Sequence, residues 1–116
     1  MNRGDIYRAE LAPRSGSEQK GIRPVIILSH NVFNQTPGWK SVIVVPVSTS
    51  TLQARRSPTI VILPRGTSGL TKESFAICHQ ITTIDRAKLQ QYIGTLEQNY
   101  LKQVEQGIKN AIDLSS

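Results

Sequence analysis

The sequence predicts a mainly β domain, in which a small barrel-like antiparallel sheet is covered by one C-terminal helix. Several short apolar segments rich in β-branched residues are separated by clusters of Gly, Pro, Asn and Ser, as strands are by turns. Only the last part of the chain repeats its apolar residues every three to four positions, which is typical of an amphipathic helix. The 116 residues suffice for one core, so we expect a single domain over residues 1–116.

The first two strands are predicted from different patterns. Residues 5–11 alternate between apolar and polar positions, which predicts a half-exposed strand. Residues 25–28 are continuously apolar, so we expect a strand that is buried on both faces. Pro24 stands at the start of this run, where a strand tolerates a missing N–H. Arg23 is therefore expected to project from the N-terminal end of a buried strand, a place where a rigid scaffold often holds binding residues.

The next strand, residues 41–47, contains a proline that limits its pairing. Pro46 cannot donate a backbone hydrogen bond, so we expect the sheet to open or bulge there. The hydroxyl-rich residues 48–51 then emerge at a break in pairing, where we expect their side chains to face solvent or a ligand.

Three further strands are predicted, over residues 59–63, 74–83 and 92–95. His79 and Gln80 form a polar interruption within the second of them.

Two helical segments complete the chain. Asp85 is expected to cap a short helical turn that ends at Leu89. Thr95 and Gln98 have the spacing of a capping box, which predicts the start of the C-terminal helix. The apolar stripe of that helix consists of Leu101, Val104, Ile108, Ala111 and Ile112.

The charge of the chain points to a polyanionic partner. Its formal net charge is +6 and its pI about 9.9, which is typical of proteins that bind nucleic acid or a membrane surface. The bases are also segregated, because Glu18 is the only acid between residues 11 and 72. The bases in that window are Arg14, Lys20, Arg23, Lys40, Arg55, Arg56, Arg65 and Lys72. One part of the surface should therefore be distinctly positive.

The single cysteine, Cys78, excludes an intramolecular disulfide framework and fits a reducing cytoplasm. Together with the distant His30 and His79 it makes no metal-ligand spacing, so we expect neither a metal nor another cofactor. The first residues show no positively charged segment followed by an apolar stretch, and no run approaches ~18 apolar residues, so we expect neither export nor membrane spanning. We therefore expect a cytoplasmic protein with no membrane partner.

Four motifs, in chain order, resemble those of the MazF/PemK (Kid-like) toxins of bacterial toxin–antitoxin pairs. Residues 3–7 are similar to the opening RG(D/E)(I/V)(Y/W), and residues 16–25 are similar to G-S/H-E-Q-x-G-x-R-P-V. Residues 44–48 resemble VVP(L/I/V)T, and residues 80–85 resemble Q-x-x-T-I-D. The resemblance implies a homodimeric barrel of the CcdB/PemK type (Src-homology-3-like) and metal-independent cleavage of single-stranded RNA. It also implies an acidic antitoxin whose disordered tail binds across the RNA site.

Two positions depart from the family pattern. Ser48, followed by Thr49, stands where the family usually has Thr, so either hydroxyl is a candidate. His79 stands where many members have Asp or Glu, and Ile77 stands where the Kid-like branch has Arg. A catalytic role that depends on those family charges does not carry over to this chain.

RNA supplies its own nucleophile, the 2′-OH, so cleavage needs only a base, a cation for the developing charge and an acid for the leaving oxygen. Arg23 is the best cation, because its planar fork matches phosphate oxygens. Ser48 or Thr49 is expected to donate to the same phosphate, and Glu18 suits the role of base or of a partner that orients Arg23. His79 is a candidate acid or base.

Each of these assignments has a structural alternative. Arg23 and Glu18 could simply pair to close the loop, and the two hydroxyls could bond their own backbone. His79, interrupting an apolar strand, could be a satisfied structural histidine.

The residues expected to contact RNA without doing chemistry are Gln19, Lys20, Trp39, Arg55, Arg56 and Gln80. Arg55 and Arg56 would contact the phosphate backbone, although a solvated turn is the alternative. Trp39 would stack a base, although it could equally anchor its loop. Cys78 is expected to be a small buried residue.

Three functions fit a basic barrel of this kind. The leading hypothesis is a sequence-selective endoribonuclease toxin that leaves a 2′,3′-cyclic phosphate and a 5′-hydroxyl. The alternatives are a non-catalytic module that binds RNA or a partner protein, and a CcdB-like gyrase inhibitor. The residues between Glu18 and Arg23 argue against the last of these.

Overall fold

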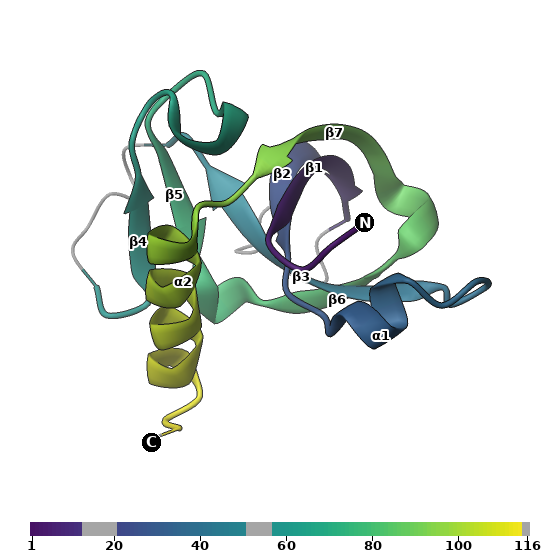
Figure 1. Ribbon diagram of the computed structural model, residues 1–116. Helices are drawn as coiled ribbons and strands as arrows, with labels where there is room; N and C mark the ends of the chain where they lie inside the picture. The colour runs from purple at the N-terminus through teal and green to yellow at the C-terminus, as the bar shows by residue number, and fades with distance from the viewer. Residues whose placement is uncertain (13–20, 51–56, 115–116) are drawn as a thin grey trace.

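The computed structural model describes residues 1–12, 21–50 and 57–114 (Figure 1). Seven strands form its sheet: β1 (Asp5–Leu11), β2 (Gly21–Ile27), β3 (Ser41–Ser48), β4 (Ile60–Leu63), β5 (Ser74–Ile77), β6 (Thr82–Asp85) and β7 (Leu89–Thr95). The α-helices are α1 (Asn31–Asn34) and α2 (Gln98–Ala111). Three single turns of 3-10 helix also occur: η2 (Thr67–Gly69), η3 (Cys78–Gln80) and η4 (Arg86–Lys88).

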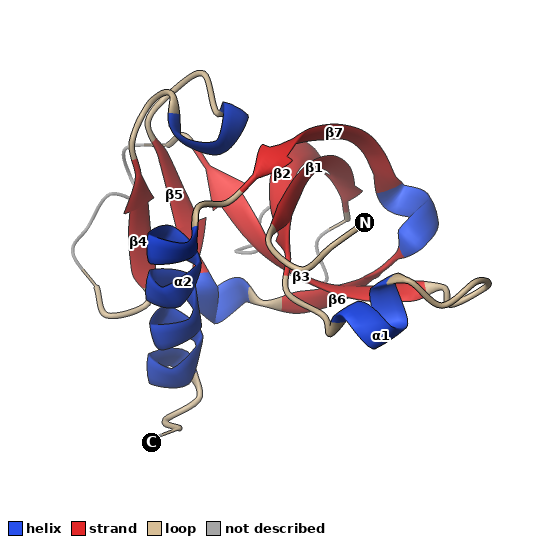
Figure 2. Cartoon of the chain, in the orientation of Figure 1, coloured by secondary structure: helices blue, strands red, loops and turns tan. Residues whose placement is uncertain are grey.

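All strand pairs are antiparallel, and the order across the sheet is β4-β5-β3-β2-β1-β7, with β6 also paired to β3. The strands curl round, and α2 lies against β4 and η3 (Figure 2). The predicted fold class, a mainly β barrel-like sheet with a C-terminal helix, is therefore confirmed. Among the described residues, neither helix is long and apolar enough to cross a membrane.

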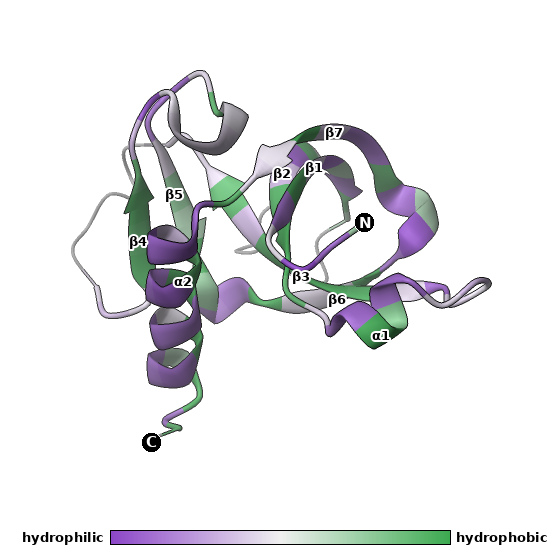
Figure 3. Cartoon of the chain, in the orientation of Figure 1, coloured by the Kyte–Doolittle hydropathy of each residue, from purple (hydrophilic) through white to green (hydrophobic). Residues whose placement is uncertain are grey.

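The sheet separates two apolar cores. One core lies between the sheet and α2 and includes Ile26, Val45 and Val104, while the other lies inside the curl of the strands and includes Val25 and Val44. Because successive side chains of a strand point to opposite faces, β2 contributes to both cores in turn. The prediction that residues 25–28 are buried on both faces is confirmed. The outward face of α2 is hydrophilic (Figure 3).

The two strand prolines lie where pairing is one-sided. Pro24 is the fourth residue of β2, not its first as predicted, because Gly21 to Arg23 also pair with β1. The strand β3 joins β2 only from Val25 onward, so Pro24 lies in a part of β2 that is paired along one edge. At Pro46 the predicted break is confirmed: one edge of β3 pairs with β6 up to Val44 and with β5 from Val47 onward.

The single strand predicted over residues 74–83 is wrong. The chain forms β5, one turn of 3-10 helix at η3, and then β6. The polar residues His79 and Gln80 lie in that turn. The turn carries the chain along the edge of β3, from the residues that pair with β5 to those that pair with β6. It therefore lies beside Pro46, where β3 pairs with neither strand.

The capping box predicted at Thr95 and Gln98 is also wrong. Thr95 is the last residue of β7, and its hydroxyl donates to Asp5 Oδ1 at 2.9 Å instead of capping α2. The N-cap of α2 is Glu97, whose side chain makes no capping bond. The predicted cap at Asp85 is confirmed, since its Oδ1 accepts the N–H of Ala87 at 2.8 Å.

Candidate functional site

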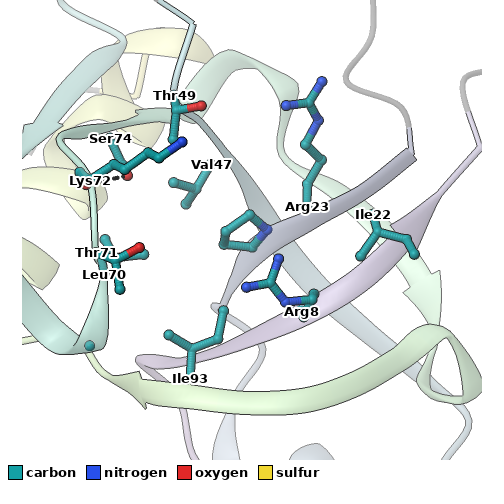
Figure 4. Close-up of a pocket in the computed structure, with 12 residues that line it drawn as sticks. Arg8, Ile22, Arg23, Val47, Thr49, Leu70, Thr71, Lys72, Ser74 and Ile93 are labelled. Atoms are coloured by element: carbon teal, nitrogen blue, oxygen red, sulfur yellow. Dashed lines mark hydrogen bonds between the residues drawn. The ribbon is translucent and has the colours of Figure 1, made fainter.

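A cavity of about 320 Å³ opens where β1, β2 and the end of β3 meet the chain between η2 and β5. Arg8 and Arg23 rise from neighbouring strands on one side, and Thr49 and Lys72 lie on the other (Figure 4). Among the described residues that line it, three are cations and none is a carboxylate. Such a lining attracts an anion, and guanidinium groups beside hydroxyls are the donors that bind phosphate oxygens.

Strand pairing fixes the two arginines. Arg23 lies opposite Ala9, and Arg8 lies opposite Pro24, so the β1–β2 register brings both side chains to one end of the sheet. Arg23 is half-buried, whereas Arg8 is exposed. A guanidinium that is partly shielded from water interacts with a bound anion more strongly than an exposed one.

The opposite wall is held by close backbone contacts. At Gly94 of β7 an added Cβ would lie 2.2 Å from the carbonyl oxygen of Ser68, and at Gly69 it would lie 2.5 Å from that of Ile93. Glycine is therefore required on both sides of the η2–β7 contact. Beyond η2, Ser74 Oγ donates to the carbonyl oxygen of Lys72 at 2.9 Å. These contacts set the position of the chain that carries Lys72.

The two candidate hydroxyls differ in accessibility. Ser48 is 2% exposed, and its Oγ accepts the N–H of Ser50 at 3.1 Å. The expectation that Ser48 faces solvent is therefore wrong, because its pairing with Phe75 keeps it in the sheet. Thr49 is exposed and lines the cavity together with Arg23. Of the two, only Thr49 lines the cavity.

His79 lies outside this cavity. It is exposed in η3, at the end of β5 opposite to Ser74, and its Nδ1 is 2.9 Å from Thr59 Oγ1. Thr59 Oγ1 is in turn 3.0 Å from Ser57 Oγ. Gln80, which is half-buried in the same turn, also does not line the cavity. Within one chain the structure thus brings Arg23 and Thr49 together but not His79.

Trp39 also lies elsewhere, just before the start of β3, whereas Thr49 follows its end. The indole is 42% exposed and stacks on Phe33, with ring centroids 4.8 Å apart. Five further candidates lie outside the described residues: Glu18, Gln19, Lys20, Arg55 and Arg56.

Two cavity residues were not singled out from the sequence. Arg8 is one of the polar positions of the alternating first strand, and Lys72 belongs to the basic window. Alternation shows that the Arg8 side chain is exposed, but its proximity to Arg23 depends on the β1–β2 register. The position of Lys72 depends on the packing of η2 against β7.

Burial raises the pKa of two side chains that do not line the cavity. Burial raises the pKa of the Cys78 thiol to about 12, and the thiol is fully enclosed in the core beneath α2. The predicted buried role of Cys78 is confirmed. Burial, together with the nearby Asp5 carboxylate, raises the pKa of Tyr7. Within the described ranges, no group of three His, Cys, Asp or Glu side chains is arranged to hold a metal ion.

Comparisons with known proteins show the family to which the chain belongs. The family model described as PemK-like, MazF-like toxin of type II toxin–antitoxin system matches residues 2–112. A relative from Staphylococcus saprophyticus, endoribonuclease MazF, is 35% identical over 115 residues, which cover 99% of this chain and 90% of the relative.

Solved structures share the fold over the full chain. The toxin MazF-mt6 of Mycobacterium tuberculosis has a TM-score of 0.78 at 28% identity, covering 97% of this chain and 99% of that one. An endoribonuclease from a mycobacterial species, solved in complex with its cognate antitoxin, has a TM-score of 0.78 at 23% identity, covering 100% and 98% of the two chains. The chain therefore belongs to the PemK-like, MazF-like toxins of type II toxin–antitoxin systems.

Proposed function

We propose that this toxin is a metal-independent, sequence-selective endoribonuclease that cleaves single-stranded RNA, mRNA included, to a 2′,3′-cyclic phosphate and a 5′-hydroxyl. Endoribonuclease activity is named for its relative at 35% identity, and family membership favours it over a non-catalytic RNA module or a gyrase inhibitor. The observation that carries the proposal is the cavity that combines Arg8, Arg23, Lys72 and the Thr49 hydroxyl without a described carboxylate.

In the proposed reaction the 2′-oxygen attacks the adjacent phosphorus, the 2′-O–P bond forms, and the bond from phosphorus to the 5′-oxygen breaks. A base takes the 2′-OH proton and an acid protonates the leaving 5′-oxygen. Arg23 and Thr49 donate to the non-bridging oxygens, whose negative charge grows in the transition state. Arg8 and Lys72 add positive charge on either side of the same phosphate.

Glu18 is our candidate base, because it is the one acid between residues 11 and 72 and its basic neighbours favour the carboxylate. We assign His79 to the reaction only across a homodimer, since within one chain it lies outside the cavity. Gln19, Lys20, Gln80, Arg55 and Arg56 remain proposed RNA contacts. The last two would carry affinity that weakens with salt.

The proposed protein partner is a cognate acidic antitoxin. One structural neighbour was solved in complex with its cognate antitoxin, and an acidic tail would complement the positive cavity of this chain. Because that tail would occupy the RNA site, adding it should stop cleavage. The proposed location of toxin and antitoxin is the cytoplasm.

The two hydroxyls provide the experiment. We expect Thr49→Val to slow cleavage of an unstructured RNA in EDTA by about 10²–10³-fold, the typical effect of removing one donor to a developing oxyanion. Ser48→Ala is the matched control and should retain activity within a few-fold, because Ser48 is buried and already bonded to Ser50. Equal activity of wild-type protein and Thr49→Val would contradict the proposal.

A further inference from the structure

A second cavity, of about 530 Å³, lies next to the start of β3 and is lined by Gly38, Trp39, Lys40, Asp85, Arg86 and Ala87. Lys40 immediately precedes β3, whereas Thr49 of the first cavity immediately follows it. At about 3.3 Å per residue, the eight residues of β3 separate the two cavities by roughly 25 Å.

The aromatic wall of this cavity is fixed before any ligand binds. Phe33 of α1 stacks on Trp39 with an interplanar angle of 29° and covers one face of the indole. His30 packs edge-on against Phe33 and also caps α1, since its Nδ1 accepts the N–H of Val32 at 3.0 Å. The indole remains 42% exposed beside the cavity. A supported, half-exposed aromatic ring is the platform on which proteins stack single-stranded bases.

The polar wall of the cavity carries a net positive charge, and its Arg86 is hydrogen-bonded to the loop that carries Trp39. The backbone N–H of Arg86 donates to the carbonyl oxygen of Lys40 at 2.6 Å, and its Nη2 donates to that of Phe33 at 3.1 Å. Among the described atoms, Arg86 Nε is buried and has no hydrogen-bond partner. Lys40 and Arg86 together outweigh the single carboxylate of Asp85. A phosphate is therefore favoured beside the ring.

We propose that this second cavity binds an unpaired nucleotide of an RNA strand, with its base stacked on Trp39 and its phosphate next to Lys40 and Arg86. Asp85 Oδ1 already accepts the N–H of Ala87, and its other oxygen, which has no partner among the described residues, would accept from the amino edge of a base. A planar ring flanked by cations fits a nucleotide, because each nucleotide supplies both a base to stack and a phosphate for the cations, whereas Asp and Glu side chains supply charge alone. The inference rests on the proposed function, because the strand held here is the one cut at the Arg23 cavity. Trp39 would thus stack on a base several nucleotides from the scissile phosphate.

The test uses the fact that Trp39 is the only tryptophan of the chain. A fully 2′-O-methylated dodecanucleotide, which cannot be cleaved, should quench the tryptophan fluorescence of the wild-type protein in a saturable manner. Because the Arg23 cavity is remote, Arg23→Ala should show the same maximal quench at a higher RNA concentration. Absence of quenching while the labelled oligonucleotide still binds, as seen by anisotropy, would overturn the inference.

Variants measured by anisotropy provide the second arm. Trp39→Leu, which keeps an apolar contact for Phe33, should weaken binding of the dodecanucleotide by about five- to a hundredfold, while Trp39→Phe should weaken it less. Lys40→Gln should weaken binding and lower its salt dependence. Lys102→Gln, on the exposed face of α2, is the control with the same change in charge. Urea unfolding of each variant checks that the fold is intact.

The two proposals fail differently. If Trp39→Leu binds the dodecanucleotide like the wild type but Thr49→Val no longer cleaves RNA, only the second site is rejected. If Trp39→Leu weakens binding but Thr49→Val still cleaves at the wild-type rate, the proposed chemistry is rejected and the second site stands. If the wild-type protein cleaves RNA but does not bind the oligonucleotide at all, the second site is rejected and the proposed chemistry stands.

Discussion

Three glycines near the cavity allow steric overlap and backbone strain to be measured separately. At Gly94 an added Cβ would lie 2.2 Å from Ser68 O, and ordinary contact begins at 3.4 Å, so η2 would have to move by about 1.2 Å. At Gly66 nothing lies within 4 Å, but φ is +87°. Gly69 combines both problems, with φ +84° and a Cβ position 2.5 Å from Ile93 O.

We expect Gly66→Ala to lower the free energy of unfolding by about 1–2 kcal/mol, the cost of a left-handed alanine. Gly94→Ala should lower it by about 1–3 kcal/mol, the usual cost of overpacking. Gly69→Ala should lower the free energy of unfolding by about the sum of these two costs, because its steric overlap and its backbone strain arise from different atoms. Urea unfolding midpoints, compared at constant slope, measure these differences.

The same substitutions should separate stability from RNA binding. Gly69 and Leu70 line the Arg23 cavity and Gly66 does not. Gly94→Ala, which displaces η2, should therefore weaken RNA binding, while Gly66→Ala should leave it unchanged. The reasoning is refuted if Gly94→Ala is as stable as the wild type, or if Gly66→Ala is less stable than Gly69→Ala.

Three other predictions follow from buried or bridging groups. Because the pKa of Cys78 rises from 9.0 to about 12 on folding, the unfolded chain loses the thiol proton first, and the free energy of unfolding should fall as the pH rises above about 9. In Cys78→Ala the free energy of unfolding should depend less on pH in this range, and the same pH dependence in variant and wild type would contradict this. Thr95→Val removes the donor to the buried Asp5 carboxylate and should cost about 1–3 kcal/mol in thermal or urea unfolding, whereas the exposed Thr83→Val should cost far less. If His79 acts across a homodimer, mixing inactive Arg23→Ala and His79→Ala proteins should restore about a quarter of wild-type cleavage, because half of the dimers are mixed and each mixed dimer holds one complete site. No recovery of cleavage after exchange of subunits would exclude that role.

The elements that could be predicted from sequence are those whose cause is local. The continuous apolar run of β2, the periodic stripe of α2 and the cap at Asp85 each depend on neighbouring residues, and all are present. The capping box at Thr95 failed because a carboxylate from the other end of the chain, Asp5, binds its hydroxyl. The prediction of a single strand over residues 74–83 was wrong because the split into β5 and β6 depends on how one edge of β3 pairs with two partner strands.

The candidate site was predicted in part for the same reason. Arg23 and Thr49 follow from motifs within a few residues of the strand ends, and the structure places both at one cavity. Arg8 and Lys72 were missed because their proximity depends on the β1–β2 register and on the packing of η2 against β7. The choice of Thr49 over Ser48 depends on where β3 stops pairing with β5.

Primer extension on a long RNA incubated in EDTA tests most directly whether the Arg23 guanidinium stabilises the phosphate during cleavage. The wild-type protein should produce discrete stops at a short recurring sequence. Arg23→Ala should cleave at least about 10²-fold more slowly, and Arg23→Lys, which keeps the charge without the planar fork, should be intermediate. Cleavage by Arg23→Ala at the wild-type rate and at the same positions would contradict the account.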